Sequence, residues 1–273
     1  MAAAAVSGLE NGSATGGGAG SGRRARAEAL ASWHDDWSGL RVAVLGLGAV
    51  EFSAADTLVE LGARVRVIHE GQDPDLERLL DVIGSERFSS DDPAGRIRDL
   101  AAFAPDLVVA PSALSAAHPL AEWADANAVP LWGDLELGWR LRDKTPRVAD
   151  WISVTGSRDT AETVRLVAHM LVAAGLRAVP SDAGSPILDA LRDPQGYDAI
   201  VVELSAEQLL RARGVSPYAS VCLDFSSESG DEKPADRARG ALARVYERTQ
   251  VACVYNRADP ETERMVEEAD VIE

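Results

Sequence analysis

From Leu40 to the end of the chain, short runs of β-branched residues alternate with stretches of helical length, and this alternation restricts the fold more than any other feature. Strands separated by helices of roughly 10–15 residues indicate βαβ units and a mainly parallel sheet. The predicted strands are residues 41–45, 64–68, 106–110, 129–132, 151–154, 197–203, 220–224 and 251–255, with helices near 51–62, 160–175 and 234–247. Because the polar stretch 142–147 reads as a linker, we predict two α/β domains, at residues 37–147 and 148–273.

The first 36 residues differ in composition from the rest of the chain. They are mostly Ala, Gly and Ser, with a small cluster of arginines at positions 23, 24 and 26. Such a segment buries too little apolar area to offset the entropy lost on ordering, so we expect residues 1–36 to form a mostly disordered tail. Three arginines are too few to favour a nucleic-acid-binding arm.

The chain carries 44 acidic residues against 27 Lys and Arg, a formal net charge of −17. A surface of this sign repels phosphate backbones and anionic lipids, so we expect neither a nucleic-acid partner nor a membrane partner. No apolar stretch approaches the roughly 20 residues of a membrane span, and the N-terminus lacks the apolar core of a secretory signal. Cys222 and Cys253 are isolated, which argues against a zinc site and a disulfide scaffold. We therefore expect a cytoplasmic protein.

A glycine-containing turn, Gly46-Leu-Gly48-Ala-Val-Glu51, follows the first predicted strand. Glycines in such a turn let the backbone approach a phosphate at the N-terminus of the next helix. Glu51 stands at the position of the third glycine, and its carboxylate competes with a phosphate. The turn is therefore consistent either with a nucleotide site or with a tight connection that binds nothing. Glu70, at the end of the second strand, is placed to meet a ribose hydroxyl or to remain a solvated carboxylate.

The second domain begins with a strand, a glycine-containing loop and a helix, which is the layout of a P-loop. The loop consists of Thr155, Gly156, Ser157, Arg158, Asp159, Thr160 and Ala161. A P-loop ends in Gly-Lys-Ser/Thr, because the lysine binds the β- and γ-phosphates and the hydroxyl binds magnesium. This ending is absent, and the two lysines of the chain, Lys144 and Lys233, lie elsewhere. We predict that the loop does not bind ATP and that the chain uses no cofactor.

Two acidic residues near this loop strengthen the prediction. Asp159 and Glu162 have the spacing of a capping box, in which Asp159 accepts from the free amides of the helix start and Glu162 bonds the cap amide. A phosphate about 4 Å from one such carboxylate meets roughly 4 kcal/mol of repulsion at an effective dielectric near 20. We therefore expect the two side chains to occupy the amides that a phosphate needs.

Glu203 ends an apolar strand and is the one candidate metal ligand. A carboxylate at the carboxyl end of a strand in an α/β sheet suits magnesium. Without a phosphate opposite it, a solvated or helix-capping role is the alternative. No catalytic residue is predicted.

Long stretches of the chain resemble the Mur ligase family, in particular its UDP-N-acetylmuramoyl-L-alanine:D-glutamate ligases. The matching stretches are residues 129–141, 173–177, 202–205 with Gln208, 251–256 and 257–263. The resemblance implies a Rossmann-like N-terminal domain and a P-loop-NTPase-like central domain, without the third, C-terminal domain that family members use to bind the amino acid. It also implies peptidoglycan synthesis, in which ATP with magnesium phosphorylates a muramoyl-alanine carboxylate and D-glutamate displaces the phosphate.

The chain departs from the family pattern in its phosphate loops. The family loop T-G-T-N-G-K-T-T appears as residues 155–162, with Thr160 at the lysine position. The family turn G-N-I-G appears as residues 181–184. In the first domain, Glu51 replaces the last glycine of the uridine-nucleotide turn, and Ser112 stands where a glycine follows Ala-Pro.

The metal set of the family is reduced in the same way. The segment L-N-x-x-x-D-H-L-D appears as residues 223–231, with Ser229 where a metal-binding histidine is expected. Leu242 and Ala243 stand where the family has a carbamylated lysine. Of the metal set, only Glu203 carries over.

Three functional hypotheses follow from these residues. The first is a degenerate or deactivated homologue of the ligase that does not bind ATP or catalyse, with a cell-wall enzyme as a candidate partner. The second is a working ligase, or a fragment completed by a third domain on another chain. The third is a module that holds a UDP-muramoyl-type nucleotide through Gly46, Gly48 and Glu70 without catalysis.

Overall fold

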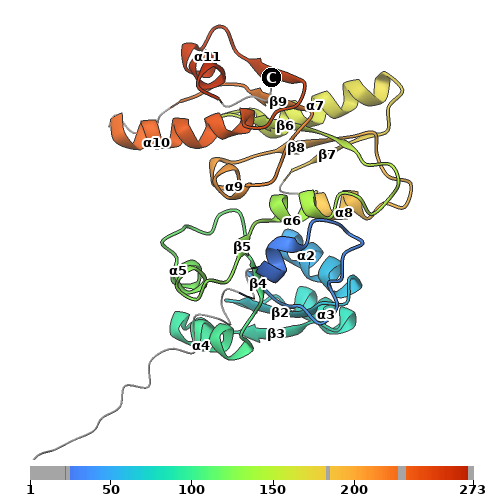
Figure 1. Cartoon of the computed structure of the whole chain (residues 1–273), viewed down its shortest axis with the longest axis vertical. Helices are drawn as coiled ribbons and strands as arrows, with labels where there is room; N and C mark the ends of the chain where they lie inside the picture. The colour runs from blue at the N-terminus through green and yellow to red at the C-terminus, as the bar shows by residue number, and fades with distance from the viewer. Residues whose placement is uncertain (1–21, 23–24, 183–184, 227–231, 270–273) are drawn as a thin grey trace, which may run out of the picture.

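Two five-stranded sheets, each flanked by helices, make up the computed structural model of the chain, which describes residues 22, 25–182, 185–226 and 232–269 (Figure 1). The first sheet contains β1 (Arg41–Leu45), β2 (Arg64–His69), β3 (Glu86–Ser89), β4 (Leu107–Val109) and β5 (Leu131–Trp132). The second contains β6 (Asp150–Thr155), β7 (Ala178–Ser181), β8 (Ala199–Glu203), β9 (Ala219–Cys222) and β10 (Ala252–Tyr255). Their orders are β3-β2-β1-β4-β5 and β10-β9-β6-β8-β7, and all neighbouring strands are parallel. The predicted class of two parallel α/β sheets is confirmed.

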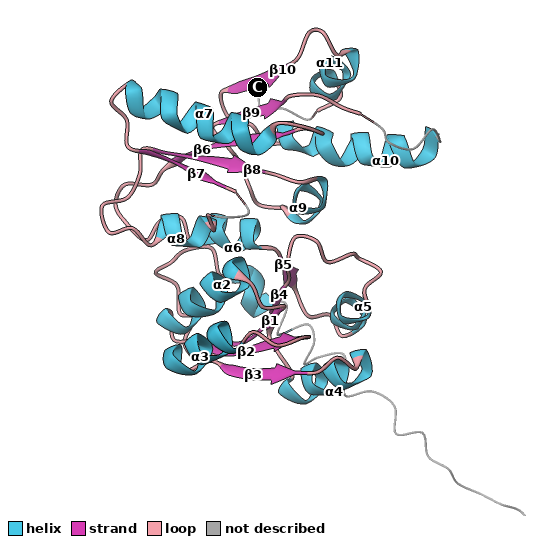
Figure 2. Ribbon diagram, turned by 180° about the vertical axis from the view of Figure 1, so that it is seen from behind, coloured by secondary structure: helices cyan, strands magenta, loops and turns pink. Residues whose placement is uncertain are grey.

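Helices connect the strands in both halves (Figure 2). They are α2 (Ala49–Glu60), α3 (Pro74–Ile83), α4 (Pro93–Phe103), α5 (Pro119–Ala126), α6 (Asp134–Arg140), α7 (Thr160–Ala173), α8 (Ile187–Leu191), α9 (Ala206–Arg211), α10 (Glu232–Ala243), the 3-10 turn η1 (Arg244–Tyr246) and α11 (Pro260–Glu267). Four of them start with the same local device, a side chain that accepts a backbone N–H and is followed by proline. The capping residues are Asp73, Asp92, His118 and Asp259.

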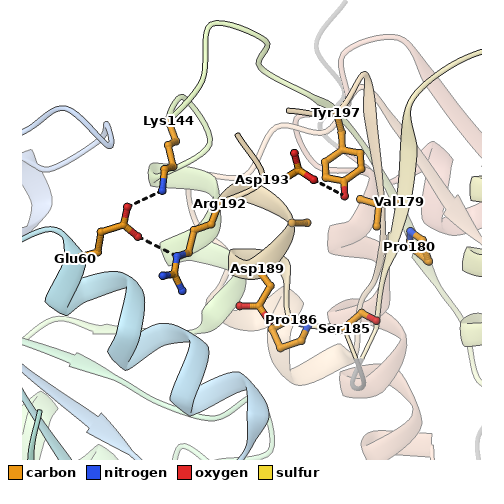
Figure 3. A pocket seen from close by; sticks show the side chains of 11 residues that line it. Glu60, Lys144, Val179, Pro180, Ser185, Pro186, Asp189, Arg192, Asp193 and Tyr197 are labelled. Atoms are coloured by element: carbon orange, nitrogen blue, oxygen red, sulfur yellow. Dashed lines mark hydrogen bonds and ion pairs between the residues drawn. The ribbon is translucent and has the colours of Figure 1, made fainter. Parts of the chain in front are cut away.

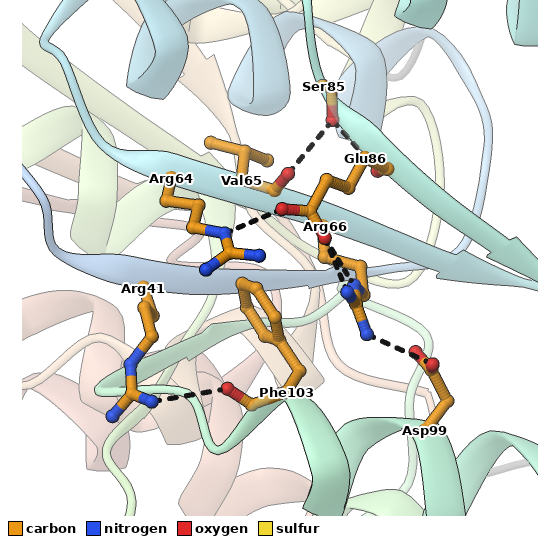
Figure 4. A network of polar contacts seen from close by, with 8 residues as sticks. All are labelled: Arg41, Arg64, Val65, Arg66, Ser85, Glu86, Asp99 and Phe103. Atoms are coloured by element: carbon orange, nitrogen blue, oxygen red, sulfur yellow. Dashed lines mark hydrogen bonds and ion pairs between the residues drawn. The ribbon is translucent and has the colours of Figure 1, made fainter.

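The sequence did not predict β3 and β7, which both lie at a sheet edge. The edge strand β3 reads Glu-Arg-Phe-Ser and has no apolar run. Figure 4 shows what holds it: Glu86 accepts from Arg64 Nε at 2.6 Å and from Arg66 Nε at 3.0 Å, both on β2. Arg66 also donates to Asp99 at 3.0 Å and lies 4.6 Å from the centre of the Phe103 ring. Charged contacts with β2, and not a run of apolar side chains, thus hold β3 at the sheet edge, which is why the sequence pattern did not predict this strand.

The prediction of a disordered tail is wrong for residues 25–36. Residues 25–29 are helical, and Ala27 and Leu30 are buried against the first domain. Asp143 accepts from Ser32 Oγ at 2.5 Å and from the amide of Trp33 at 2.7 Å. Ala27 and Leu30 are close enough to the first strand to pack into its hydrophobic core. The average composition of all 36 residues does not show this, because most of them are Ala, Gly and Ser. Residues 1–21 and 23–24 lie outside the described part.

Glu136 of α6 joins the two halves of the molecule. Its side chain is 3% exposed and accepts from the amides of Arg213 at 3.0 Å and Gly214 at 2.9 Å, in the segment after α9. It also accepts from Arg140 Nε at 2.9 Å. A Cβ at Gly214 would lie 3.1 Å from Glu136 Oε1, so glycine permits this close approach. One buried carboxylate therefore satisfies backbone donors of the other domain.

Apolar packing surrounds this contact. The rings of Trp139 and Trp151 meet edge to face with centroids 5.1 Å apart. Gly138 lies against Trp151 and Ile187 of α8, where a side chain would not fit without movement. None of the helices that the structure describes is long and apolar enough to cross a membrane.

We predict that Glu136→Ala lowers the free energy of unfolding by about 3 kcal/mol, because two backbone amides and Arg140 lose the buried carboxylate that accepts from them. Urea titration followed by circular dichroism measures the change. Glu122→Ala, at an exposed position of α5, is the matched control and should shift stability by less than about 0.5 kcal/mol. Equal stability of the Glu136 variant and the parent would contradict this role.

Candidate functional site

The carboxyl ends of both sheets open onto one cavity of about 370 Å³ between the domains. This is the edge at which open parallel α/β sheets bind ligands. The lining residues include Glu51, Ser112 and Asp134 from the first domain, and Gly156, Thr160 and Glu203 from the second. The fold thus brings the predicted loop, the predicted metal ligand and Glu51 to one place.

The turn after β1 is covered by its own glutamate. Gly46 has φ +92°, a conformation that favours glycine. A Cβ at Gly48 would lie 2.7 Å from Glu51 Oε2, and one at Gly46 would lie 3.5 Å from Glu51 Cγ. The Glu51 side chain therefore folds back over both glycines, at the N-terminus of α2 where a phosphate would bind.

Two half-buried carboxyl groups of the first domain, those of Glu51 and Asp134, face this cavity. Burial raises the pKa of Glu51, and the charge of Asp134 raises it further. Burial also raises the pKa of Asp134, against the hydrogen bond donated by Gln208. Gln208 Nε2 lies 3.3 Å from Asp134 Oδ1 and reaches it from the other domain. Gln208 itself is fixed by a capping box with Ser205 at the start of α9.

The predicted capping box of Asp159 and Glu162 is wrong. Asp159 does occupy the N-cap position of α7, but its side chain makes no capping hydrogen bond, and Glu162 is exposed. The backbone of Asp159 is left-handed, with φ +58°, whereas a capping aspartate has an extended backbone. Asp159 therefore has a backbone conformation that glycine adopts more readily than an L-residue does.

A carboxylate from another segment occupies the loop amides. Asp224 Oδ1, two residues after β9, accepts from the amide of Ser157 at 2.7 Å and from that of Arg158 at 3.3 Å. Arg158 Nε pairs with Asp224 Oδ2 at 3.3 Å. A Cβ at Gly156 would lie 2.9 Å from Asp224 Oδ1, so this approach requires the glycine. Sequence reasoning expected an acid from the loop itself and missed the acid that follows the neighbouring strand β9.

The rest of the loop is bound to the sheet. Thr160 Oγ1, at the position of the P-loop lysine, donates to Glu203 Oε1 at 2.5 Å. Thr155 Oγ1 donates to the carbonyl of Leu204 at 2.7 Å. Ser157 Oγ accepts from the amide of Ser226 at 2.8 Å, and Ala161 lies half-buried in the first turn of α7. Glu203 as a metal ligand remains a prediction, and the described residues contain no group of three or more His, Cys, Asp or Glu placed to hold a metal ion.

Other predicted positions lie away from the cavity or outside the described residues. Glu70 pairs with Arg96 Nη1 at 2.9 Å and does not line the cavity. Leu242, where the resemblance implies a carbamylated lysine, is buried in the core. Ser229, where it implies a metal-binding histidine, belongs to residues 227–231, which the structure does not describe.

Sequence reasoning missed Asp134 and Asp224. Asp224 is the last residue of the predicted strand 220–224, and Asp134 comes two residues after the predicted strand 129–132. Their position at the carboxyl edge of a sheet was therefore the available signal. Their contacts were not predictable, because each depends on how strands far apart in the sequence are ordered. Asp224 meets the loop only because β9 lies beside β6.

A larger hollow of about 740 Å³ lies on the outer side of the same junction (Figure 3). Its two cations meet one carboxylate: Lys144 Nζ lies 2.7 Å from Glu60 Oε1, and Arg192 Nε lies 3.0 Å from Glu60 Oε2. Arg192 also donates to Asp56 at 2.5 Å. These paired charges connect α2 to the second domain, so neither of the two cations among the described lining residues is without a carboxylate partner.

No family model matches the chain, but individual relatives do. It is 51% identical over 261 residues to the UDP-N-acetylmuramoylalanine–D-glutamate ligase of Leifsonia xyli, which covers 91% of this chain and 50% of the relative. Identity to the enzymes of the same name is 36% in Tropheryma whipplei and 37% in Streptomyces coelicolor, over 90% and 87% of this chain. The chain spans about half the length of these curated relatives.

Solved structures share the fold at low identity. A ligase from Neisseria meningitides that joins UDP-N-acetylmuramate to L-alanyl-γ-D-glutamyl-meso-diaminopimelate matches with a TM-score of 0.56 and 16% identity, covering 86% of this chain and 77% of that one. A murein peptide ligase from Psychrobacter arcticus matches with a TM-score of 0.53 and 15% identity, covering 85% and 52%. At this identity the likeness concerns the fold alone.

We predict that Glu51→Gln stabilises the fold at neutral pH. Because the pKa of Glu51 is raised in the folded state, its favourable contribution is complete below the ordinary value of 4.5 and is lost as the pH rises through the folded value. Glutamine imitates the protonated form, so the gain in unfolding free energy should appear at pH 7 and vanish near pH 4. Urea titrations at both pH values measure it, with exposed Glu122→Gln as the control. A gain of equal size at both pH values would contradict burial of the charge as the cause.

Proposed function

Because the chain belongs to the Mur ligase family over the half of its relatives that it spans, we propose that it keeps the two-domain scaffold of these ligases without their ATP-dependent reaction. The observation that carries this proposal is the position of Asp224. Its carboxylate holds the amides of Ser157 and Arg158, which are the donors that a P-loop offers to phosphate.

The charges of the cavity favour the same proposal. Four carboxylates line it, those of Glu51, Asp134, Asp182 and Glu203, and no lysine, arginine or histidine is among the described lining residues. A triphosphate brings further negative charge into this partly dry space, where repulsion is stronger than in water. The residues present therefore do not fit Mg-ATP, and we assign no step of ligation to them.

The two alternative functions find less support. A third domain on another chain would not supply a lysine at the position of Thr160. It would also not remove the Asp224 carboxylate from the loop amides. A UDP-sugar module would need the turn of Gly46 and Gly48, over which the Glu51 side chain lies. A scaffold that binds a partner protein, such as a cell-wall enzyme, needs neither phosphate site.

Calorimetry tests the proposal directly. We expect no heat of binding for Mg-ATP at concentrations up to about 1 mM. A Kd of about 1 mM corresponds to a binding free energy of roughly −4 kcal/mol. The Leifsonia xyli relative, titrated in parallel, is the positive control. Micromolar affinity of this chain for Mg-ATP would overturn the proposal. Saturable binding of UDP-N-acetylmuramoylalanine without turnover would replace it by the UDP-sugar module.

We predict that rebuilding the loop restores ATP binding only in part while Asp224 remains. The loop variant combines Arg158→Asn, Asp159→Gly, Thr160→Lys, Ala161→Thr and Glu162→Thr. Adding Asp224→Asn should tighten ATP binding at least about tenfold further, because the carboxylate leaves the amides. Ligase turnover should stay absent, since Leu242 and Ser229 remain.

The single variant Asp224→Asn is the matched control and should not bind ATP, because the lysine is still missing. Equal ATP affinity of the loop variant with and without Asp224→Asn would show that Asp224 does not compete with phosphate. Turnover in either variant would show that the remaining site suffices for catalysis.

A further inference from the structure

A segment before β1 packs against the first domain at both of its ends. Residues 27–37, the strap, bury the side chains of Ala27, Leu30 and Trp37 in the same hydrophobic core that contains β1. Trp37 Nε1 also donates to the carbonyl of Ser32 at 3.0 Å, which holds the middle of the strap in a closed turn. The strap is therefore anchored to the first domain.

The middle of the strap binds the chain where it leaves the first domain. Asp143 accepts from Ser32 Oγ at 2.5 Å and from the amide of Trp33 at 2.7 Å, and its carbonyl oxygen lies 3.0 Å from His34 Nε2. Burial alone would raise the pKa of Asp143, but the hydrogen bonds from Ser32 and Trp33 outweigh it and lower this pKa. Lys144 Nζ lies 4.1 Å from the centre of the Trp33 ring. The strap thus holds Asp143 and Lys144 on the first domain.

The residues that follow are held by the second domain. A Cβ at Gly196 would lie 2.7 Å from Thr145 Oγ1 and 3.1 Å from the carbonyl oxygen of Arg147, so both residues pack closely on this glycine. Arg147 Nη1 also pairs with Asp198 Oδ1 at 3.4 Å, directly before β8. The chain therefore passes from one domain to the other between Lys144 and Thr145. While the strap is bound, few backbone dihedral angles are free to absorb a rotation of the domains.

Arg140 connects the strap to the contact between the domains. Its Nη1 donates to two strap carbonyls, that of Leu30 at 2.5 Å and that of Glu28 at 3.1 Å. Its Nε donates to Glu136 at 2.9 Å, and Glu136 in turn accepts from two amides of the second domain. One guanidinium thus binds the strap and also the carboxylate that joins the domains. Contiguous polar contacts of this kind couple distant positions when they have two arrangements.

We propose that the strap restrains rotation of the two domains about the chain between Lys144 and Thr145. Release of the strap from Asp143 frees the residues before this point and lets Arg140 move away from Glu136. The domains then separate at the Glu136 contact, and the cavity between the two sheets widens without unfolding of either domain. A strap that only stabilised the first domain would, on release, loosen that domain as a whole. This inference does not depend on what the cavity binds.

Residue-resolved hydrogen–deuterium exchange of the full chain tests the proposal. Asp143→Ala removes the carboxylate that binds the strap, and Ser32→Ala removes one of its two donors. The amides of Arg213 and Gly214, which donate to Glu136, should exchange at least about tenfold faster in Asp143→Ala, because they are freed when the domains separate. Ser32→Ala should accelerate them less. The amides of β1 and β6 should exchange as slowly as in the parent chain.

Asp125→Ala, at an exposed position of α5, is the matched control and should leave the exchange of Arg213 and Gly214 unchanged. Circular dichroism checks that each variant keeps its helix content. Acceleration of the β1 amides together with these two would show that the strap merely stabilises the first domain, and the proposal would then be wrong. Unchanged exchange of the two amides in Asp143→Ala, or an equal effect of Asp125→Ala, would also contradict it.

Discussion

The buried carboxylate of Glu136 holds the two domains in the orientation on which the candidate site depends. It is anchored on α6 of the first domain and accepts from two amides of the second. A buried carboxylate without hydrogen-bond donors would lower the stability of the fold. The two amides therefore stabilise Glu136, and Glu136 in turn supplies the acceptor that the amides require. With this contact made, the carboxyl ends of both sheets face each other across one cavity.

In and beside that cavity, acidic side chains bond the loop after β6 and cover the turn after β1. Asp224 lies on the loop amides, Glu51 lies over the first turn, and Thr160 bonds Glu203 where a P-loop has its lysine. Asp224 and Glu203 accept hydrogen bonds from the loop, whereas Glu51 lies in a dry environment that raises its pKa and disfavours its charged form. Acidic side chains from both domains therefore line the cavity: Glu51 and Asp134 from the first, and Asp182 and Glu203 from the second.

The sequence predicted the fold far better than the site. Regular alternation of apolar strands and helices was sufficient for the two sheets, but the edge strands β3 and β7 escaped detection, because Arg64, Arg66 and Glu86 hold β3 where apolar patterning is absent. The sequence showed directly that the loop has no lysine at the P-loop position. The sequence did not show which acid accepts from the loop amides. Asp224 lies next to the loop only because β9 pairs with β6, and the left-handed backbone of Asp159 differs from the extended backbone of a capping aspartate.

The left-handed backbone of Asp159 also bears on what this loop can accommodate. An L-residue there carries strain of about 1–2 kcal/mol, which aspartate partly relieves. Glycine adopts this conformation without that strain. The main chain between β6 and α7 is therefore compatible with a glycine at this position, whatever the side chains around it favour.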